Sequence, residues 1–210
     1  MQPQTRLDVT PGEADAIRTA VRAADPAEMG HGYVVAAHRH IAPLVDFLVD
    51  PRVSGPIYDL PAPISLETVG EWIAASEILH QNGEALLAVA TDPDGRISRY
   101  SRFTVWPELS CAEIAGAHRL DHQNRGEGKA GAANSFDWMF RRFGVRLICV
   151  TAALDNVRSA RVIEAAGFEP RGIREAVRAD GSRRQSRYLE MSRDAWLVSH
   201  RPEPGSEPFL

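Results

Sequence analysis

The chain has 210 residues, a hydrophobic content of 44% and a formal net charge of −4 at pH 7, values that are typical of one globular domain. The negative net charge does not indicate a protein that binds nucleic acid. No apolar run approaches the roughly 20 residues that span a bilayer. Cys111 and Cys149 do not have the spacing of a metal site, so we expect two buried thiols and no metal. The N-terminus lacks a signal-peptide pattern, so we expect a soluble cytoplasmic protein.

The first thirty residues predict one helix ahead of the main domain. Thr10, Pro11 and Glu13 form a capping box with proline at the first helical position. The apolar residues that follow share one helical face: Ala14, Ile17, Val21 and Ala24. We interpret residues 1–30 as an N-terminal extension that serves as a packing helix or a dimerisation element.

The next fifty residues predict a short strand and two helices. The strand is expected at 33–37, and the helices at 41–50 and 65–83, where Gly83 ends the second one. The proline-rich stretch GPIYDLPAP between the two helices is expected to be a loop that lines a pocket.

From Glu84 onward the hydrophobic period changes to that of strands. Residues 85–92 and 96–106 flank the sequence Asp-Pro-Asp-Gly, a strong hairpin turn. The stretch 111–120 predicts a third strand of this antiparallel meander.

The last third of the chain alternates helices and strands. Residues 128–143 predict a helix that Gly144 ends, and the nearly continuous apolar run 145–154 predicts a strand buried on both faces. A short helix follows Asn156, then a hairpin, and residues 199–210 are expected to be a disordered tail. The order predicts an α/β (α+β) domain over 31–198, with a mixed, mostly antiparallel sheet and one crossover.

The stretch QNRGEGKAG, residues 123–131, fits both Q-x-x-G-x-G and the dinucleotide-binding pattern G-x-G-x-x-G. Polar residues separate the preceding strand from Gly126, and the chain offers one crossover rather than repeated ones, which disfavours the dinucleotide interpretation. A phosphate site and a plain helix start both remain open. Gly126 and Gly128 expose amides at a positive helix end, Arg125 and Lys129 add charge, and Gly131 suits close packing.

A second motif lies about thirty residues later. Asn156 is followed by Ser159 and then by the pair Gly167–Phe168. Together with Q-x-x-G-x-G, this resembles the GNAT superfamily of acyl-CoA N-acyltransferases, and most of all its ribosomal-protein N-terminal acetyltransferase (RimJ/RimL-like) branch. The resemblance covers about Ala85 to Trp196.

The resemblance implies a GNAT-like sheet, flanked by helices, that splays into a V after the third strand of the meander, with coenzyme A in the opening. Backbone amides of the glycine loop would hold the pyrophosphate, the strand near Leu120 would pair with the pantetheine arm, and Asn156 would bond the cofactor beside the thioester. An alternative role for Asn156 is simple helix capping. The loop residues concerned are Gln123, Arg125, Gly126, Gly128, Lys129 and Ala130.

The resemblance also implies direct attack of an amine on the thioester of acetyl-CoA or another short acyl-CoA. Many members of the superfamily protonate the leaving sulfur with a tyrosine, but Ile163 occupies that position here. In the resembling branch a serine three residues after the asparagine is the proposed acid, and Ser159 lies at this position. The alternative is that Ser159 is an ordinary helix serine that bonds its own backbone. Glu113 is the favoured general base, and His118 and His122 are alternatives. Strand alternation places Glu113 and His118 on opposite faces.

The resemblance implies a primary amine as the acceptor, with a protein N-terminus as one candidate beside antibiotics, polyamines and sugar amines. Candidate walls are the proline-rich loop, Trp72, Trp106 and the last hairpin, although both tryptophans suit the core better. Four arginines either favour an acidic acceptor or are only charged residues on the strand surface: Arg99, Arg102, Arg183 and Arg184. A monomer or homodimer is expected. The alternative function is a catalytically silent acyl-CoA-binding sensor or scaffold.

Overall fold

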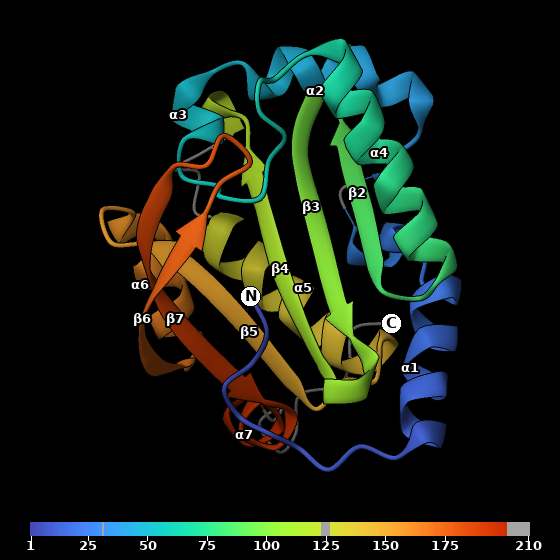
Figure 1. Cartoon of the computed structure of the whole chain (residues 1–210), viewed down its shortest axis with the longest axis vertical. Helices are drawn as coiled ribbons and strands as arrows, with labels where there is room; N and C mark the ends of the chain where they lie inside the picture. The colour runs from blue at the N-terminus through green and yellow to red at the C-terminus, as the bar shows by residue number, and fades with distance from the viewer. Residues whose placement is uncertain (31, 123–126, 201–210) are drawn as a thin grey trace.

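The computed structural model describes residues 1–30, 32–122 and 127–200, and of residues 122 and 127–129 it describes the backbone alone. These residues form one open seven-stranded sheet with helices on both faces (Figure 1). The strand order is β1-β2-β3-β4-β5-β7-β6, and every neighbouring pair is antiparallel except β4 and β5. The mixed, mostly antiparallel sheet with one crossover is therefore confirmed. The strands are β1 (Tyr33–Val35), β2 (Ala85–Thr91), β3 (Ile97–Trp106), β4 (Cys111–His118), β5 (Leu147–Ala153), β6 (Glu169–Val177) and β7 (Arg183–Ser192).

The helices follow local capping signals closely. The Thr10 hydroxyl accepts a hydrogen bond from the Glu13 amide at 3.2 Å, as the predicted cap requires. Two short helices, α3 and α7, were not predicted, because neither is long enough to show a helical period. The helices are α1 (Pro11–Ala23), α2 (Ile41–Leu48), α3 (Pro51–Ser54), α4 (Leu66–Gln81), α5 (Glu127–Arg142), α6 (Val157–Ala165) and α7 (Arg193–Ser199).

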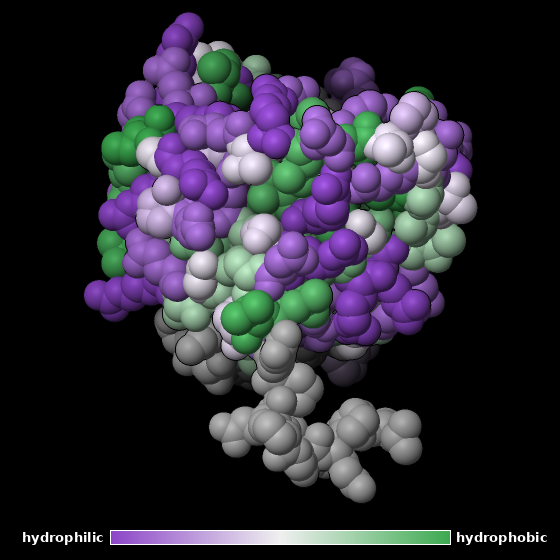
Figure 2. Space-filling view, turned by 90° about the horizontal axis from the view of Figure 1, so that it is seen from below, coloured by the Kyte–Doolittle hydropathy of each residue, from purple (hydrophilic) through white to green (hydrophobic). Residues whose placement is uncertain are grey.

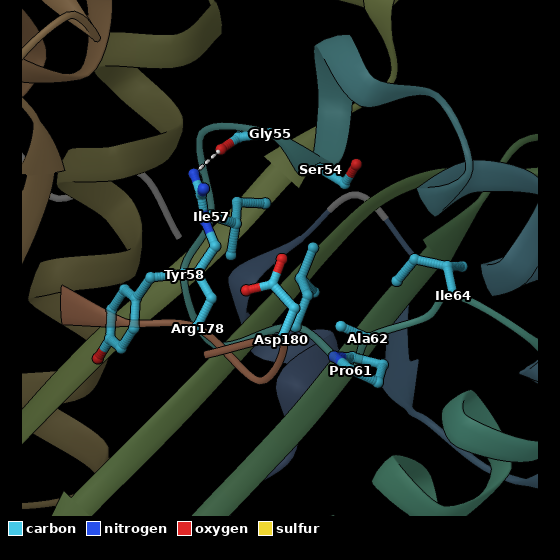
Figure 3. A pocket seen from close by; sticks show the side chains of 10 residues that line it. Ser54, Gly55, Ile57, Tyr58, Pro61, Ala62, Ile64, Arg178 and Asp180 are labelled. Atoms are coloured by element: carbon cyan, nitrogen blue, oxygen red, sulfur yellow. Dashed lines mark hydrogen bonds between the residues drawn. The ribbon is translucent and has the colours of Figure 1, made fainter. Parts of the chain in front are cut away.

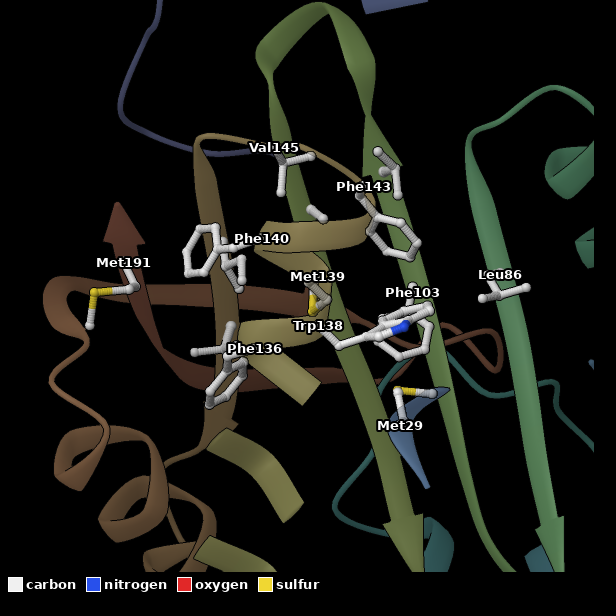
Figure 4. Close-up of a cluster of buried hydrophobic side chains, with 14 of the residues drawn as sticks. Met29, Leu86, Phe103, Phe136, Trp138, Met139, Phe140, Phe143, Val145 and Met191 are labelled. Atoms are coloured by element: carbon white, nitrogen blue, oxygen red, sulfur yellow. The ribbon is translucent and has the colours of Figure 1, made fainter. Parts of the chain in front are cut away.

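A large hydrophobic core fills one face of the sheet. Aromatic side chains of α5 pack there against the centre of β3, and Figure 4 shows Trp138 lying beside Phe103 with Phe143 close by. Ile17 and Val21 bring α1 into the same core, which is the packing role considered for the N-terminal helix. The domain boundary near residue 30 stays a prediction.

A second core covers the other face over β2 and β3. It is built from α2, α3, α4 and the loop between α3 and α4. Trp72 packs against this core, and Trp106 packs against a third, smaller cluster, so both tryptophans take the predicted core positions. Hydrophobic cores thus cover both faces of the sheet over β2 and β3.

The face of the molecule seen from below is mostly polar (Figure 2). Seen from below, the molecule is covered mostly by hydrophilic residues, with hydrophobic side chains in small separate groups (Figure 2). Among the residues described, none of the helices combines the length and the apolar character needed to cross a membrane. Of the predicted tail, Ser199 ends α7, and residues 201–210 lie outside the described part of the chain.

Candidate active site

The two central strands part after a short parallel contact. β4 pairs with β5 only from Cys111 to Glu113, opposite Leu147 to Cys149. Beyond that point β4 stays paired with β3 up to His118, and β5 stays paired with β7 up to Ala153. A V-shaped opening therefore begins directly after Glu113, which is the predicted splay.

The edge of β4 that faces this opening carries backbone amides. In an antiparallel pair, alternate residues direct their backbone groups to the same side. The Arg119 amide donates to the Ser98 carbonyl at 2.8 Å, on the β3 side, so Gly116 and His118 direct their amides toward the opening. Leu120 is not part of this strand, because β4 ends at His118 and Leu120 begins a short 3₁₀ turn that packs against the second core. Leu120 therefore lies just beyond β4, and its role beside a pantetheine arm stays a prediction.

Gly116 is required by the close approach of β3. A β-carbon at this position would lie 2.4 Å from the Tyr100 carbonyl oxygen, so a backbone would have to move. Gly116→Ala is expected to lower the free energy of unfolding by about 1–3 kcal/mol, measured by urea denaturation. Gly131→Ala is the matched control. A β-carbon there meets no described atom within 4 Å, so alanine in α5 should stabilise by up to about 1 kcal/mol.

The same observation corrects the predicted role of Gly131. No described atom lies within 4 Å of a β-carbon at this position, so close packing against the described part of the chain does not explain the glycine. Equal stability losses in the two alanine variants would contradict both interpretations.

Glu113 is a buried carboxylate at the apex of the splay, with only 4% of its surface exposed. The Tyr58 hydroxyl donates to Glu113 Oε2 at 3.0 Å, and the Thr151 hydroxyl donates to Oε1 at 3.4 Å. The α-amino group of Met1 also contacts Oε2. Burial raises the pKa of Glu113 above the ordinary value of a carboxyl group, and the Met1 amine opposes part of that rise. A buried carboxyl group in contact with an amine is suited to accept a proton from it.

The second motif lies across the opening from β4, because β5 leads directly into α6. Asn156 Oδ1 accepts a hydrogen bond from the Ser159 amide at 3.1 Å, so the capping role of Asn156 is confirmed. Ser159 is half-buried in the first turn of α6. Ile163, which occupies the position of the usual tyrosine acid, is buried and packs α6 against the main core. The roles of Asn156 and Ser159 toward a bound cofactor stay predictions.

The glycine loop is only partly described. Gln123, Arg125 and Gly126 lie outside the described residues, whereas Gly128, Lys129 and Ala130 belong to the first turn of α5. The positive end of this 16-residue helix therefore follows the open end of β4. Of the alternative bases, His118 is half-buried at the end of β4, and the side chain of His122 is not described.

The loop between α3 and α4 lines a pocket, as its proline-rich sequence predicted, and also reaches Glu113. Tyr58 comes from this loop, and its neighbour Asp59 pairs with Arg102 of β3 at 2.9 Å. A pocket of about 200 Å³ lies between the loop and the turn that joins β6 to β7 (Figure 3). At its edge, Arg178 donates to the Gly55 carbonyl at 2.8 Å. Sequence patterns could not identify Tyr58 as a partner of Glu113.

The arginines near this loop are engaged within the protein. Arg102 pairs with Asp59, and Arg183 pairs with Glu175 at 2.6 Å. Arg184 donates to the Pro56 carbonyl and lies over the Tyr58 ring. Arg99 is buried. These contacts favour a structural role for the charges over recognition of an acidic acceptor. Within the described ranges, no cluster of three or more His, Cys, Asp or Glu side chains is arranged to hold a metal ion.

Solved structures of several acetyltransferases share the fold of this chain. Ribosomal-protein-S5-alanine acetyltransferase from Vibrio fischeri superposes with a TM-score of 0.66 at 15% identity, over 78% of this chain and 93% of that one. RimL, the ribosomal L7/L12 alpha-N-protein acetyltransferase in complex with coenzyme A, gives 0.62 at 17% identity over 77% and 93%. The aminoglycoside acetyltransferase AAC(6')-Ib with ribostamycin and coenzyme A gives 0.65 at 19% identity over 82% and 98%.

No curated protein matches the chain. The model of the acetyltransferase (GNAT) domain family, however, matches residues 13–169. This range includes the splay, Glu113, the glycine loop and Ser159. Because the match spans well over half of the 210 residues, the chain belongs to the GNAT acetyltransferase family and is an acetyl-CoA-dependent N-acetyltransferase.

Proposed function

We propose that Glu113 is the general base for transfer of an acetyl group to a primary amine that enters from the side of the Tyr58 loop. The observation that carries this proposal is the position of Glu113. It is a buried carboxylate with a raised pKa at the apex of the splay, and it is already in contact with an amine. Most arriving amines are protonated near neutral pH, so a base that accepts this proton is needed before attack.

The opening suits the extended shape of acetyl-CoA. The Gly116 and His118 amides point into it from one edge and can pair with the peptide-like pantetheine arm. We propose that the start of α5, with Gly128, Lys129 and Ala130, holds the pyrophosphate together with Gln123, Arg125 and Gly126, and that Asn156 lies beside the thioester. A strand amide aimed at the developing oxyanion contributes roughly 3 kcal/mol where such donors have been tested.

The transfer then needs a set of proton movements. Glu113 takes the extra proton of the arriving ammonium group, with Tyr58 holding the carboxylate in place, and the neutral nitrogen then bonds to the carbonyl carbon. The carbon–sulfur bond breaks, the thiolate takes a proton from Ser159, the proton that the acylated nitrogen loses returns to the serine through water, and Glu113 releases its proton to water. The products are an N-acetylated amine and free coenzyme A thiol. We further propose a cytoplasmic location, which the two free buried thiols favour.

Ser159→Ala is expected to lower the turnover number about 10²-fold while acetyl-CoA binding stays intact. Turnover is measured as thiol release across a panel of amino-acid amides, peptides, a polyamine and an aminoglycoside. Binding is measured by thermal shift, where ligand at about 100 times its dissociation constant stabilises by about 2.7 kcal/mol. Ser182→Ala, in the exposed turn between β6 and β7, is the control. Unchanged turnover in Ser159→Ala would exclude the serine as the acid.

The same panel separates the enzyme from a silent acyl-CoA-binding module. Stabilisation by acetyl-CoA without thiol release for any amine would favour the silent module. The structural neighbours act on a ribosomal protein and on an aminoglycoside, so the panel includes both classes of amine.

A further inference from the structure

The first residues of the chain lie across the face of the sheet at the apex of the splay. Figure 1 shows the N-terminus in front of the sheet beside β4 and β5. Met1 and Leu7 pack against a small cluster that joins these strands to β7, and Pro3 is buried. The cluster consists of Cys111, Leu147, Cys149 and Tyr188. This N-terminal segment, Met1–Leu7, is therefore docked along the inner strands.

A buried carboxylate holds the middle of the segment. Glu190 of β7 is 1% exposed, and its Oε1 accepts the Gln4 amide at 2.6 Å. Its Oε2 accepts the Thr5 hydroxyl at 2.6 Å. Hydrogen bonds to an ionised acceptor are about twice as strong as neutral ones, so these contacts anchor the segment.

Two more side chains fix the backbone closer to the terminus. Arg174 of β6 donates to the Gln2 carbonyl at 2.8 Å, and the Tyr188 hydroxyl donates to the same oxygen at 3.3 Å. The Cys149 thiol donates to the Met1 carbonyl at 3.3 Å. Both carbonyl groups at the start of the segment are thus held by protein donors.

These anchors place the Met1 amine at the site of chemistry. Its nitrogen contacts Glu113 Oε2 and lies 3.1 Å from the Tyr58 hydroxyl. A primary amine therefore occupies the position that the proposed reaction requires of its acceptor, beside the base and at the apex of the opening between β4 and β5.

We propose that the α-amino group of Met1 is itself an acceptor, so that a chain beginning at Met1 acetylates its own terminus in cis. This inference rests on the acetyl transfer proposed above. The nitrogen bonds to the thioester carbonyl carbon and the carbon–sulfur bond breaks. The protonated amine and acetyl-CoA yield an acetylated terminus, coenzyme A thiol and one proton released to water. A tethered amine acts at an effective concentration of roughly millimolar or higher, so it competes with external acceptors.

The test uses the full chain with a free amine on Met1 and isotope-labelled acetyl-CoA. Mass spectrometry follows the label on the Met1 nitrogen, and the amine panel is assayed in parallel. We expect labelling of Met1 at a rate per molecule that does not change over an about 100-fold dilution of the protein, because the reaction is intramolecular. Glu113→Gln should slow the labelling of Met1 and of the panel together.

Thr5→Val removes one anchor and leaves the proposed catalytic groups in place. It should slow labelling of Met1 about tenfold, while transfer to the panel is retained. Arg6→Ala, at the exposed neighbouring position, is the matched control and should leave both rates unchanged. Three results would overturn the inference and leave the proposed function standing. They are labelling of the panel without labelling of Met1, a rate of Met1 labelling per molecule that rises with protein concentration, and equal rates of Met1 labelling in Thr5→Val and wild type. No label on either amine would overturn both.

Discussion

Replacing Glu113 by glutamine is expected to lower the rate of acetyl transfer by about 10²- to 10⁴-fold. Glutamine keeps the shape of the side chain and can still accept the Tyr58 hydrogen bond, but it cannot take the amine proton. Acetyl-CoA binding should persist, because the backbone amides assigned to the cofactor are unchanged. The measurement is thiol release at saturating acetyl-CoA, together with the thermal shift that acetyl-CoA produces. Glu108→Gln, at an exposed site, is the control and should keep full activity.

The pH dependence provides a second readout for Glu113. The base acts only as a carboxylate, and burial raises its pKa, so the acid limb of the rate profile should lie above the ordinary carboxyl value of about 4.3. A carboxyl group with a raised pKa binds its proton more tightly in the folded state. Its contribution to stability is present at acidic pH and is lost as the pH rises through the raised pKa.

The glutamine variant lacks this loss. Its melting temperature relative to wild type should therefore become more favourable as the pH rises from about 4 through the raised pKa of Glu113. A rate profile that is unchanged in Glu113→Gln would assign the base to another group, with His118 as the next candidate. A melting difference that does not change with pH would show that the carboxyl is not perturbed by burial.

Phe103→Ala should lower the free energy of unfolding by about 3–5 kcal/mol. The side chain is completely buried at the centre of β3, and its ring lies 5.2 Å from the Trp138 ring and 5.7 Å from the Phe143 ring, measured between centroids. Alanine removes the transfer free energy of the ring and leaves a cavity between the sheet and α5. Because the start of α5 carries the proposed pyrophosphate site, acetyl-CoA binding should weaken as well.

Urea denaturation measures this loss, with an unchanged slope against denaturant concentration as the check on two-state unfolding. Leu197→Ala provides the control. Leu197 lies in α7 with 52% of its surface exposed, so its truncation should change stability by no more than about 0.5 kcal/mol. Similar effects in the two variants would mean that the aromatic cluster is not the centre of the core.

Much of the fold could be predicted because its causes are local. The turn between β2 and β3 forms where the Asp-Pro-Asp-Gly sequence predicts it: the Asp92 amide donates to the Arg96 carbonyl, and Gly95 has a φ of +77°. The hydrogen bond between Asn156 and Ser159 spans three residues and was likewise accessible from spacing. By contrast, the seven residues of α7 are too few to show a helical period, and β4 ends two residues before its predicted end, where the 3₁₀ turn begins.

The sequence by itself determined the order of the strands and of the longer helices, the family motifs and Glu113 as the candidate base, because capping, turn chemistry and hydrophobic period act over a few residues. Only the tertiary structure decided the surroundings of that base. Tyr58 reaches Glu113 from 55 residues away, and the Met1 amine reaches it from 112 residues away. Such contacts arise when the sheet brings distant segments to one point, and they convert a strand carboxylate into a buried group with a raised pKa and an amine beside it.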